Sequence, residues 1–187
     1  MKAPDRGVSE VISVILMVAI VVILSATASV FFLGVVEDIN EPAPNVADTT
    51  GEFEAGGDLD QQLVRITHVA GESVALDELE IVVRAGGNNM DDAQVRLVDL
   101  PPSGSTFDDN NYEGNKDLAS GFGVSDGVLF DGSSTWTAGQ DIIFRITVGE
   151  ADFRDPPTGS NPEADELEVI VVHTPSNAII SEHTFRS

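Results

Sequence analysis

The sequence predicts a mainly β protein in which one long N-terminal hydrophobic α-helix is followed by an Ig-like antiparallel β-sandwich head. Three observations predict this fold class. Residues 11–36 contain no charged side chain, residues 40–60 are rich in Pro, Gly, Asp and Glu, and apolar and polar residues alternate in several stretches beyond residue 60. We therefore expect a polar segment at 1–7, a helix at 8–39, a linker at 40–60 and an acidic β-sandwich head domain at 61–187.

The apolar run at 11–36 is long enough to cross a membrane. At about 1.5 Å per residue, a helix over this run is roughly 39 Å long, whereas a hydrocarbon core is about 30 Å thick. Lys2 and Arg6 precede the run, and acidic residues follow it. Because the positively charged flank stays on the cytoplasmic side, we expect an N-in, C-out topology. An ordinary single-pass anchor and a secretory signal cut near residues 25–29 stay open as alternatives.

The stretches beyond residue 60 have the two-residue period of half-buried strands. Leu79, Ile81 and Val83 alternate with charged residues, and residues 142–148 repeat the pattern. Further strands are expected at 62–69, 94–100, 166–174 and 178–185, with a turn at 175–177. At least six short strands separated by turn signals are typical of a β-sandwich.

Two segments lack a regular period. Pro42 and Pro44 end any helix that continues past residue 36, and the glycines that follow predict a flexible linker over 40–60. Residues 101–135 are rich in Gly, Ser, Asp and Asn. We expect this segment to be a long loop with one short strand at 128–130.

The charge balance is strongly acidic. The chain has 32 Asp plus Glu against 9 Lys plus Arg, a formal net charge of −23. Such a chain will not bind nucleic acid through its phosphates. The self-repulsion is mostly screened in molar salt, so the composition favours a halophile, with an acidic mesophilic surface protein as the alternative. The absence of cysteine excludes a disulfide framework and a thiolate metal site.

Three further motifs suggest chemistry, and for each we favour an ordinary structural role. Residues 123–127, GVSDG, satisfy the hydrolase pattern G-x-S-x-G, but no strand and helix flank the serine as that chemistry needs. The histidines His68, His173 and His183 lack zinc-helix spacing. Residues 108–117 begin like an EF-hand loop, but Ser120 stands where the bidentate glutamate should be, so a solvated turn is the default. We expect no cofactor, no metal and no enzymatic activity.

The N-terminal stretch DRGVSEVISVILMVAIVVILSATASVFFLG resembles the class III signal peptide and helix of archaeal type IV pilins, in particular the haloarchaeal form. The stretches VRITHVAGESVALDELEIVV and VIVVHTPSNAIISEHTF also look like the first and last strands of haloarchaeal pilin heads. The resemblance implies that Arg6 and Gly7 end a leader, residues 1–7, which a prepilin peptidase removes, and that Val8 begins the mature chain. A small residue at the cut allows close approach of the peptidase, and cleavage removes the anchoring charges of Lys2 and Arg6.

The chain departs from the common haloarchaeal pattern at Glu10, where proline is expected, and at Ser13, where glycine is usual. Glu10 would lie near the positive end of the helix dipole and could pair with the freed ammonium of Val8 in a neighbouring subunit. A solvated carboxylate in a capping arrangement with Ser9 is the alternative. Small residues along the helix would allow close helix packing; they are Ser13, Ala19, Ser25, Ala26, Ala28, Ser29 and Gly34.

The resemblance implies a structural subunit that forms a homo-oligomeric helical pilus used for surface adhesion. It further implies a precursor in the cytoplasmic membrane and a mature form in an extracellular filament. A prepilin peptidase, a cytoplasmic assembly ATPase and a membrane platform protein would be its partners. The alternatives are a monomeric membrane-anchored extracellular binding domain and a minor pilin at a filament tip.

Overall fold

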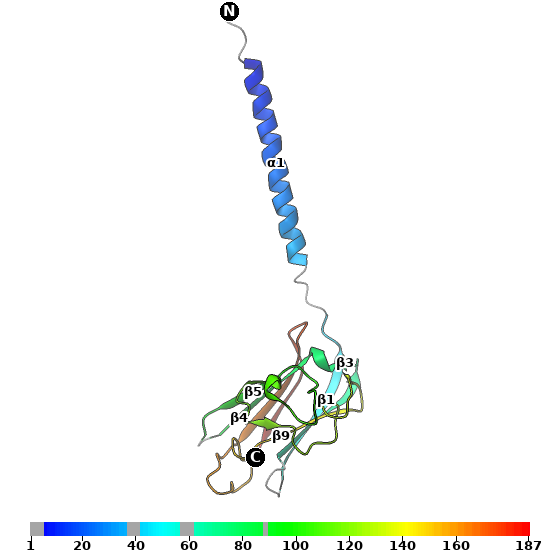
Figure 1. Cartoon of the computed structure of the whole chain (residues 1–187), viewed down its shortest axis with the longest axis vertical. Coiled ribbons are helices and arrows are strands. Elements are labelled where there is room, and N and C mark those ends of the chain that lie inside the picture. The colour runs from blue at the N-terminus through cyan, green and yellow to red at the C-terminus, as the bar shows by residue number, and fades with distance from the viewer. Residues whose placement is uncertain (1–5, 37–41, 57–61, 88–89) are drawn as a thin grey trace, which may run out of the picture. The chain divides into compact units, whose positions relative to one another are not determined.

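The computed structural model describes residues 6–36, 42–56, 62–87 and 90–187. Contacts divide the chain into two units, Met1–Asn40 and Glu41–Ser187, and each is described by itself. The first unit is the helix α1, Arg6–Val36 (Figure 1). It begins before the expected residue 8, whereas residues 1–5 of the expected leader and 37–39 of the expected helix lie outside the described residues. The apolar composition therefore predicts the helix correctly, and the expected start at residue 8 refers to the chain after removal of the leader.

The second unit is built on two antiparallel sheets (Figure 1). The four-stranded sheet has the order β1 (Val46–Ala55), β2 (Gln62–Gly71), β9 (Asp141–Ile146), β7 (Ala119–Ser120). The five-stranded sheet has the order β11 (Ala178–Arg186), β10 (Glu166–His173), β4 (Leu79–Gly86), β5 (Ala93–Leu97), β6 (Tyr112–Gly114). A short ladder joins β3 (Val74–Ala75) to β8 (Thr135–Trp136), and two 3₁₀ turns, Leu76–Glu78 and Asp109–Asn111, complete the described elements. One N-terminal apolar helix followed by antiparallel sheets confirms the predicted fold class.

The core lies between the two sheets and follows the alternation of each strand. In β2, Val64 and Ile66 are fully buried while the residues between them are half-exposed. Phe144 of β9 and Val83 of β4 join the same apolar cluster from the two sheets. Because successive side chains of a strand point to opposite faces, each sheet turns an apolar face toward the other sheet.

One lateral side of the sandwich is formed by β1 and β11. Thr49 of β1 hydrogen-bonds to Ser181 at 2.9 Å and to the Nε2 of His183 at 3.0 Å. Phe53 of β1 packs edge-on against Phe153 at 5.0 Å and lies 5.7 Å from Phe185. The edge strand of one sheet thus packs on the edge strand of the other.

The opposite lateral side is formed by β6 and β7. The hydroxyl of Tyr112 in β6 donates to the carbonyl of Ala119 in β7 at 3.0 Å. Burial, helped by the nearby carboxylates of Asp117 and Asp109, raises the pKa of Tyr112 to about 12, so the hydroxyl keeps its proton for this bond. The two sheets are therefore joined at both lateral sides.

Strand β1 is a correction to the expected linker at 40–60. Residues 46–55 form a full antiparallel ladder with β2 instead of a flexible connection. Their outward positions carry Asp48, Glu52 and Glu54, which made the segment look like linker, whereas Phe53 packs inward. Residues 57–60 of that expected linker lie outside the described residues.

The loop at 101–135 is also more ordered than expected. Residues 128–130 form a turn and not the expected short strand, and the short strands of this segment are β6 and β7. Phe107, Tyr112 and Phe130 pack edge to face within 5.2 to 5.7 Å. Leu118 and Leu129 are fully buried beneath them. These scattered apolar residues fold the loop onto the core, which no local period could indicate.

Candidate assembly surfaces

The helix α1 carries apolar side chains on all of its sides. Among the described residues, Val11–Ser29 is the single helix long and apolar enough to cross a membrane, with a mean hydropathy of 2.9. Every large apolar side chain from Val11 to Leu24 is between 51% and 72% exposed. A helix that is apolar on all sides is stable in lipid or among other helices, because water would solvate none of its faces well.

Three hydroxyl groups in the C-terminal half of α1 bond to carbonyls of the same helix. Ser25 donates to the carbonyl of Val21 at 2.7 Å, Thr27 to Leu24 at 3.0 Å, and Ser29 to Ser25 at 2.8 Å. A hydroxyl that bonds its own helix exposes no unpaired donor to hydrocarbon. These three polar residues therefore do not oppose lipid burial or helix packing.

The small residues expected to allow helix packing fall on more than one side of α1. Ala19, Ser25, Ala26 and Ser29 share a side, because their spacings of three, four and seven residues return to the same face. Ser13 lies on the opposite side. Ala28 lies at the flank of the shared face, and Gly34 lies in the last turns of the helix. The shared face is the one on which a neighbouring helix approaches most closely.

The residues of the expected cleavage site all lie in α1. Arg6 is its first residue, so the bond between Gly7 and Val8 lies in the first turn of the helix. In this uncleaved helix Glu10 lies in the second turn, since the first turn contains no acidic residue; the expected role of Glu10 concerns the chain that begins at Val8. In the full chain, Glu10 is thus one turn away from the free N–H groups that begin the helix.

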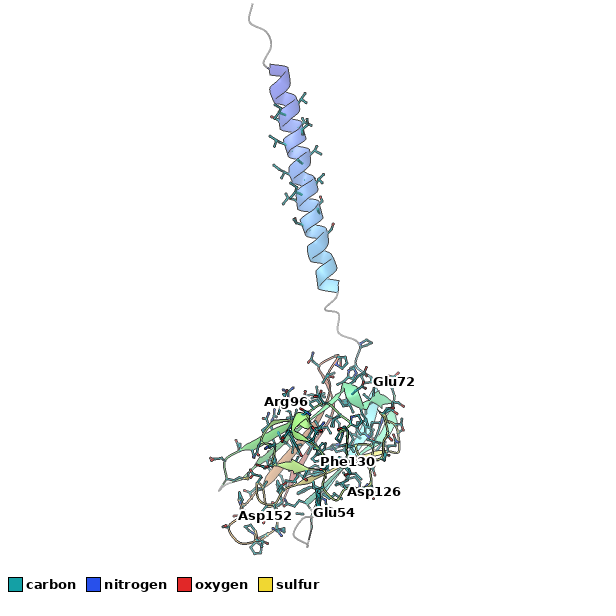
Figure 2. The ribbon with its side chains drawn as sticks, in the orientation of Figure 1. Glu54, Glu72, Arg96, Asp126, Phe130 and Asp152 are labelled. Atoms are coloured by element: carbon teal, nitrogen blue, oxygen red, sulfur yellow. The ribbon has the colours of Figure 1, made fainter. Side chains whose placement is uncertain are left out.

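Two hydrogen bonds hold the first residues of the head, before β1, against the end of β2. The backbone N–H of Asn45 donates to Glu72 Oε2 at 2.8 Å, and the N–H of Glu72 donates back to the carbonyl of Asn45 at 3.1 Å. Glu72, labelled in Figure 2, lies just beyond the end of β2. This reciprocal pair closes the ladder between β1 and β2, and the sequence offers no signal for it because the partners are far apart in the chain.

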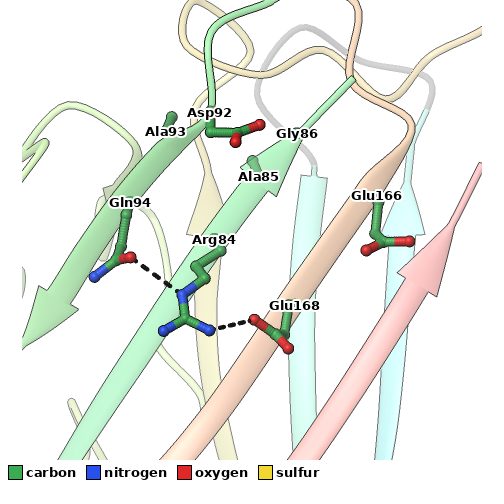
Figure 3. A pocket seen from close by; sticks show the side chains of 8 residues that line it. All are labelled: Arg84, Ala85, Gly86, Asp92, Ala93, Gln94, Glu166 and Glu168. Carbon is green, nitrogen blue, oxygen red and sulfur yellow. Dashed lines mark hydrogen bonds and ion pairs between the residues drawn. The ribbon is translucent and has the colours of Figure 1, made fainter. Parts of the chain in front are cut away.

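Arginine–carboxylate pairs cover the outer face of the five-stranded sheet. Arg96, labelled in Figure 2, donates to both oxygens of Glu80 at 2.5 and 2.6 Å and to Glu113 at 2.6 Å. Figure 3 shows Arg84 held between Gln94 at 3.1 Å and Glu168 at 2.7 Å. A bidentate pair on a buried carboxylate has well-defined geometry, so the part of this face around Arg96 and Glu80 is rigid and polar.

The hollow in Figure 3 has a volume of about 480 Å³. Its lining is mostly polar or charged and comprises Arg84, Ala85, Gly86, Asp92, Ala93, Gln94, Glu166 and Glu168. The guanidinium of Arg84 is already bonded on two sides within it. Ligand pockets are mostly apolar with a few convergent polar groups, and this hollow has the reverse composition.

A buried carboxylate organises the connection between β9 and β10. Asp152 is fully buried and accepts two side-chain bonds from Arg154 at 2.7 and 2.6 Å, and others from the N–H of Thr158 and the amide of Asn161. Burial alone would raise the pKa of Asp152, but the hydrogen bonds from Arg154, Thr158 and Asn161 outweigh it and hold the pKa well below its ordinary value. The close spacing of Asp152 and Arg154 was the available signal for this pair, and the sequence analysis missed it.

The other motifs occupy structural positions. Ser125 of GVSDG is exposed, and its hydroxyl donates to Asp126 at 3.4 Å within a loop. His68 packs on Trp136, with centroids 4.9 Å apart, while His173 bonds to Ser176 and His183 to Thr49, so the three rings lie in separate places. Residues 108–117 comprise a 3₁₀ turn, Asp109–Asn111, whose cap Asp108 accepts from the N–H of Asn110 at 2.8 Å, and then strand β6.

These features define a class of protein: a head with an antiparallel β core, preceded in the chain by an apolar helix. Residues 6–47 match the family model described as archaeal type IV pilin, N-terminal. The match covers α1 and ends inside β1, just past the point where Glu72 holds the chain. It supports a type IV pilin, a structural and not an enzymatic class. No curated protein matches the chain.

Proposed function

We propose that the chain is a structural subunit of an archaeal type IV pilus-like filament that serves surface adhesion. The observation that carries the proposal is the apolar surface of α1, exposed on every side in the segment that matches the pilin N-terminal family. Such a helix needs partners on all sides, which a bundle of identical helices provides. The strongly acidic composition supports a halophilic source.

The helix acts first as a membrane anchor and then as filament core. In lipid it needs no water, because its hydroxyls bond to its own carbonyls. On assembly it exchanges lipid contacts for helix contacts, and no buried hydrogen bond has to be broken in the exchange. The face with Ala19, Ser25, Ala26 and Ser29 allows the closest approach of a neighbouring helix. An assembly ATPase and a membrane platform protein would drive this transfer from an N-in, C-out precursor.

A prepilin peptidase would cut the class III leader, residues 1–7, between Gly7 and Val8. The bond lies in the first helical turn, where the N–H groups lack intrahelical acceptors and glycine disfavours the helix, so local unwinding is easy. Cleavage would bring Glu10 into the first turn of the shortened helix. There the carboxylate interacts with the helix dipole, by about 0.3–1 kcal/mol, and can meet the new ammonium of Val8 in a neighbouring subunit.

The intact mass of the protein from membranes and from sheared filaments tests this proposal. We expect a mature chain that starts at Val8 in the filament fraction. The variant Gly7→Leu should keep its leader, remain in the membrane fraction and form no filaments, because the peptidase needs a small residue at the cut. Val14→Leu, an apolar exchange further along α1, is the matched control and should be processed and assembled normally.

Two other masses and one sedimentation result would contradict parts of the proposal. A filament subunit that retains Met1 or Lys2 would exclude leader cleavage. A chain that starts after Ala28 would indicate conventional secretion instead. A processed chain that sediments only as a membrane-bound monomer would favour an anchored binding domain over a filament subunit.

A further inference from the structure

Large exposed apolar side chains are few on the described part of the head. They are Phe122 at 78% exposed, Ile179 at 57% and Val69 at 46%. An isolated exposed valine on a protein surface is ordinary. Burying a phenylalanine side chain contributes about 1.5–3 kcal/mol of stabilisation, and the exposed Phe122 gives up most of it. The other aromatic residues of the same loop pack in or against the core.

The structure holds Phe122 at the surface. Its backbone N–H donates to Ser120 Oγ at 3.1 Å, and the N–H of Val124 closes a turn on the carbonyl of Gly121 at 3.1 Å. A side chain cannot replace Gly121, because its Cβ would lie 2.3 Å from the ring of Phe130. Gly121 and Val124 are buried on either side of this turn, while Phe122 and Gly123 between them are exposed.

A small hollow of about 120 Å³ lies beside Phe122. Its lining comprises Ser120, Phe122, Arg145, Ile146, Thr147 and Val148. It is far smaller than the roughly 300 Å³ or more of a ligand pocket, but its size is on the order of the cavities that accept one ring or one aliphatic side chain. The lining contains an arginine and no carboxylate, which is unusual on a chain with 32 acidic residues.

Ile179 lies at the other lateral side of the sandwich. It pairs with Val172 across β10 and β11, and Ile170 and Val82 continue the same outer face toward β4. The exposed Glu182 lies next along β11 on this face, opposite Ile170. Ile170 and Val82 are buried, at 8% exposed each, so Ile179 is the exposed part of this aliphatic row, with the carboxylate of Glu182 at its border.

The sheet order places these two features on opposite sides of the head. Phe122 follows β7, the edge strand far from β1, and Ile179 belongs to β11, which packs against β1. Two different patches on opposite sides cannot pair as a closed two-fold dimer. They define a heterologous, head-to-tail contact, which is the kind of contact that an open helical filament repeats.

We propose that Ile179 of one subunit inserts into the hollow beside Phe122 of the next subunit in the filament. Arg145 at the hollow then faces Glu182 beside the inserted isoleucine, so the charges as well as the shapes are complementary. This contact rests on the proposed filament function and adds to it the part of the head surface that joins neighbouring subunits. The hollow beside Phe122 is therefore filled by a second copy of this chain.

Cysteine crosslinking in intact filaments tests the contact cleanly, because the chain has no cysteine of its own. Filaments of the double variant F122C/I179C are treated with a short bifunctional thiol crosslinker and separated under denaturing conditions. We expect a ladder of covalent dimers, trimers and larger multimers, since each subunit joins two neighbours. Neither F122C nor I179C alone should give any multimer, because a heterologous contact brings unlike positions together.

The variant F122C/V69C is the matched control, because Val69 is similarly exposed but lies on β2, outside the proposed contact. A ladder from this control, or dimers from either single variant, would overturn the proposed pairing. Filaments of F122C/I179C that contain only monomer after crosslinking would also overturn it and leave the filament function standing. Failure of the wild-type chain to enter any filament would instead contradict the proposed function.

Discussion

At the scale of single residues, buried polar side chains fix the segment that follows β9 against the end of β2. The amide of Gln62 donates to the carbonyl of Ala151 at 2.6 Å and accepts from the N–H of Phe153 at 2.6 Å. Asp152 lies between these two residues and holds the following loop. Unpaired buried polar groups cost about 1–3 kcal/mol each, so these side chains must be satisfied together.

Asp152→Asn should destabilise the head by about 3 kcal/mol at neutral pH, because it leaves Arg154 without its buried counter-charge. Urea unfolding of the full chain in detergent measures this through Trp136, the single tryptophan, which is buried in the head. Asp155→Asn removes the same charge from an exposed position three residues further on and should change stability by less than about 0.5 kcal/mol. Equal effects of the two changes would contradict a structural role for the buried carboxylate.

The same variant should also change the pH dependence of stability. The pKa of Asp152 is lower in the folded than in the unfolded chain, so its contribution is fully present above the unfolded pKa of about 4. That contribution is lost as the pH falls from about 5 toward the folded pKa. The wild-type unfolding midpoint should therefore fall more steeply below pH 5 than that of Asp152→Asn.

At the scale of elements, the packing of β1 on β11 joins the first strand of the head to the last. Gly51 lies where a Cβ would be 2.6 Å from His183 Cγ and 2.9 Å from Phe185 Cζ. Burial lowers the pKa of His183, so the ring is neutral at pH 7 when it bonds to Thr49. Because Gly51 has no side chain, β1 and β11 can pack closely against each other.

Gly51→Ala should destabilise the head by about 1–3 kcal/mol, since the added methyl forces apart rings of the core. Gly149→Ala is the matched control, because a Cβ there meets nothing within 4 Å. Its effect should stay within about 0.5 kcal/mol. The urea midpoints of the two variants, followed by the fluorescence of Trp136, measure the difference; a stable Gly51→Ala protein would show that β1 and β11 can separate at little cost.

At the scale of the whole molecule, net charge and ion pairing have opposite salt dependences. Surface pairs such as Arg84–Glu168 contribute about 0–1 kcal/mol each and weaken as salt rises. The net charge of −23 repels itself in the compact state, and this repulsion is screened within about 3 Å at 1 M salt. With 32 carboxylates against 9 cationic side chains, the repulsion should dominate.

The stability of the chain should therefore rise as NaCl increases from 0.05 to about 1 M, where the Debye length has fallen to about 3 Å. The urea midpoint at each salt concentration measures the effect. Sucrose at matched osmolality is the control, because it is excluded from protein surfaces but screens no charge. A midpoint that falls with NaCl, or one that sucrose raises equally, would contradict screening of self-repulsion as the cause.

The alternating strands β2, β4, β9, β10 and β11 were predictable, because their period of two is a local property of the chain. Strand β1 and the packing of loop 101–135 were not. The outward carboxylates of β1 look like linker until β2 lies beside it, and Phe107 and Phe130 show no period at all. The pairs Asn45–Glu72 and Gln62–Ala151 likewise join residues that are distant in sequence.

The sequence by itself determined the apolar helix, the β class of the head and its acidity, because length, hydrophobicity, period and charge are summed along the chain. Only the tertiary structure decided where Asp152, Gly51 and Glu72 find their partners. It also placed Phe122 and Ile179 on opposite sides of one sandwich. Contacts between distant segments depend on sheet order and register, and neither is written in any local stretch of residues.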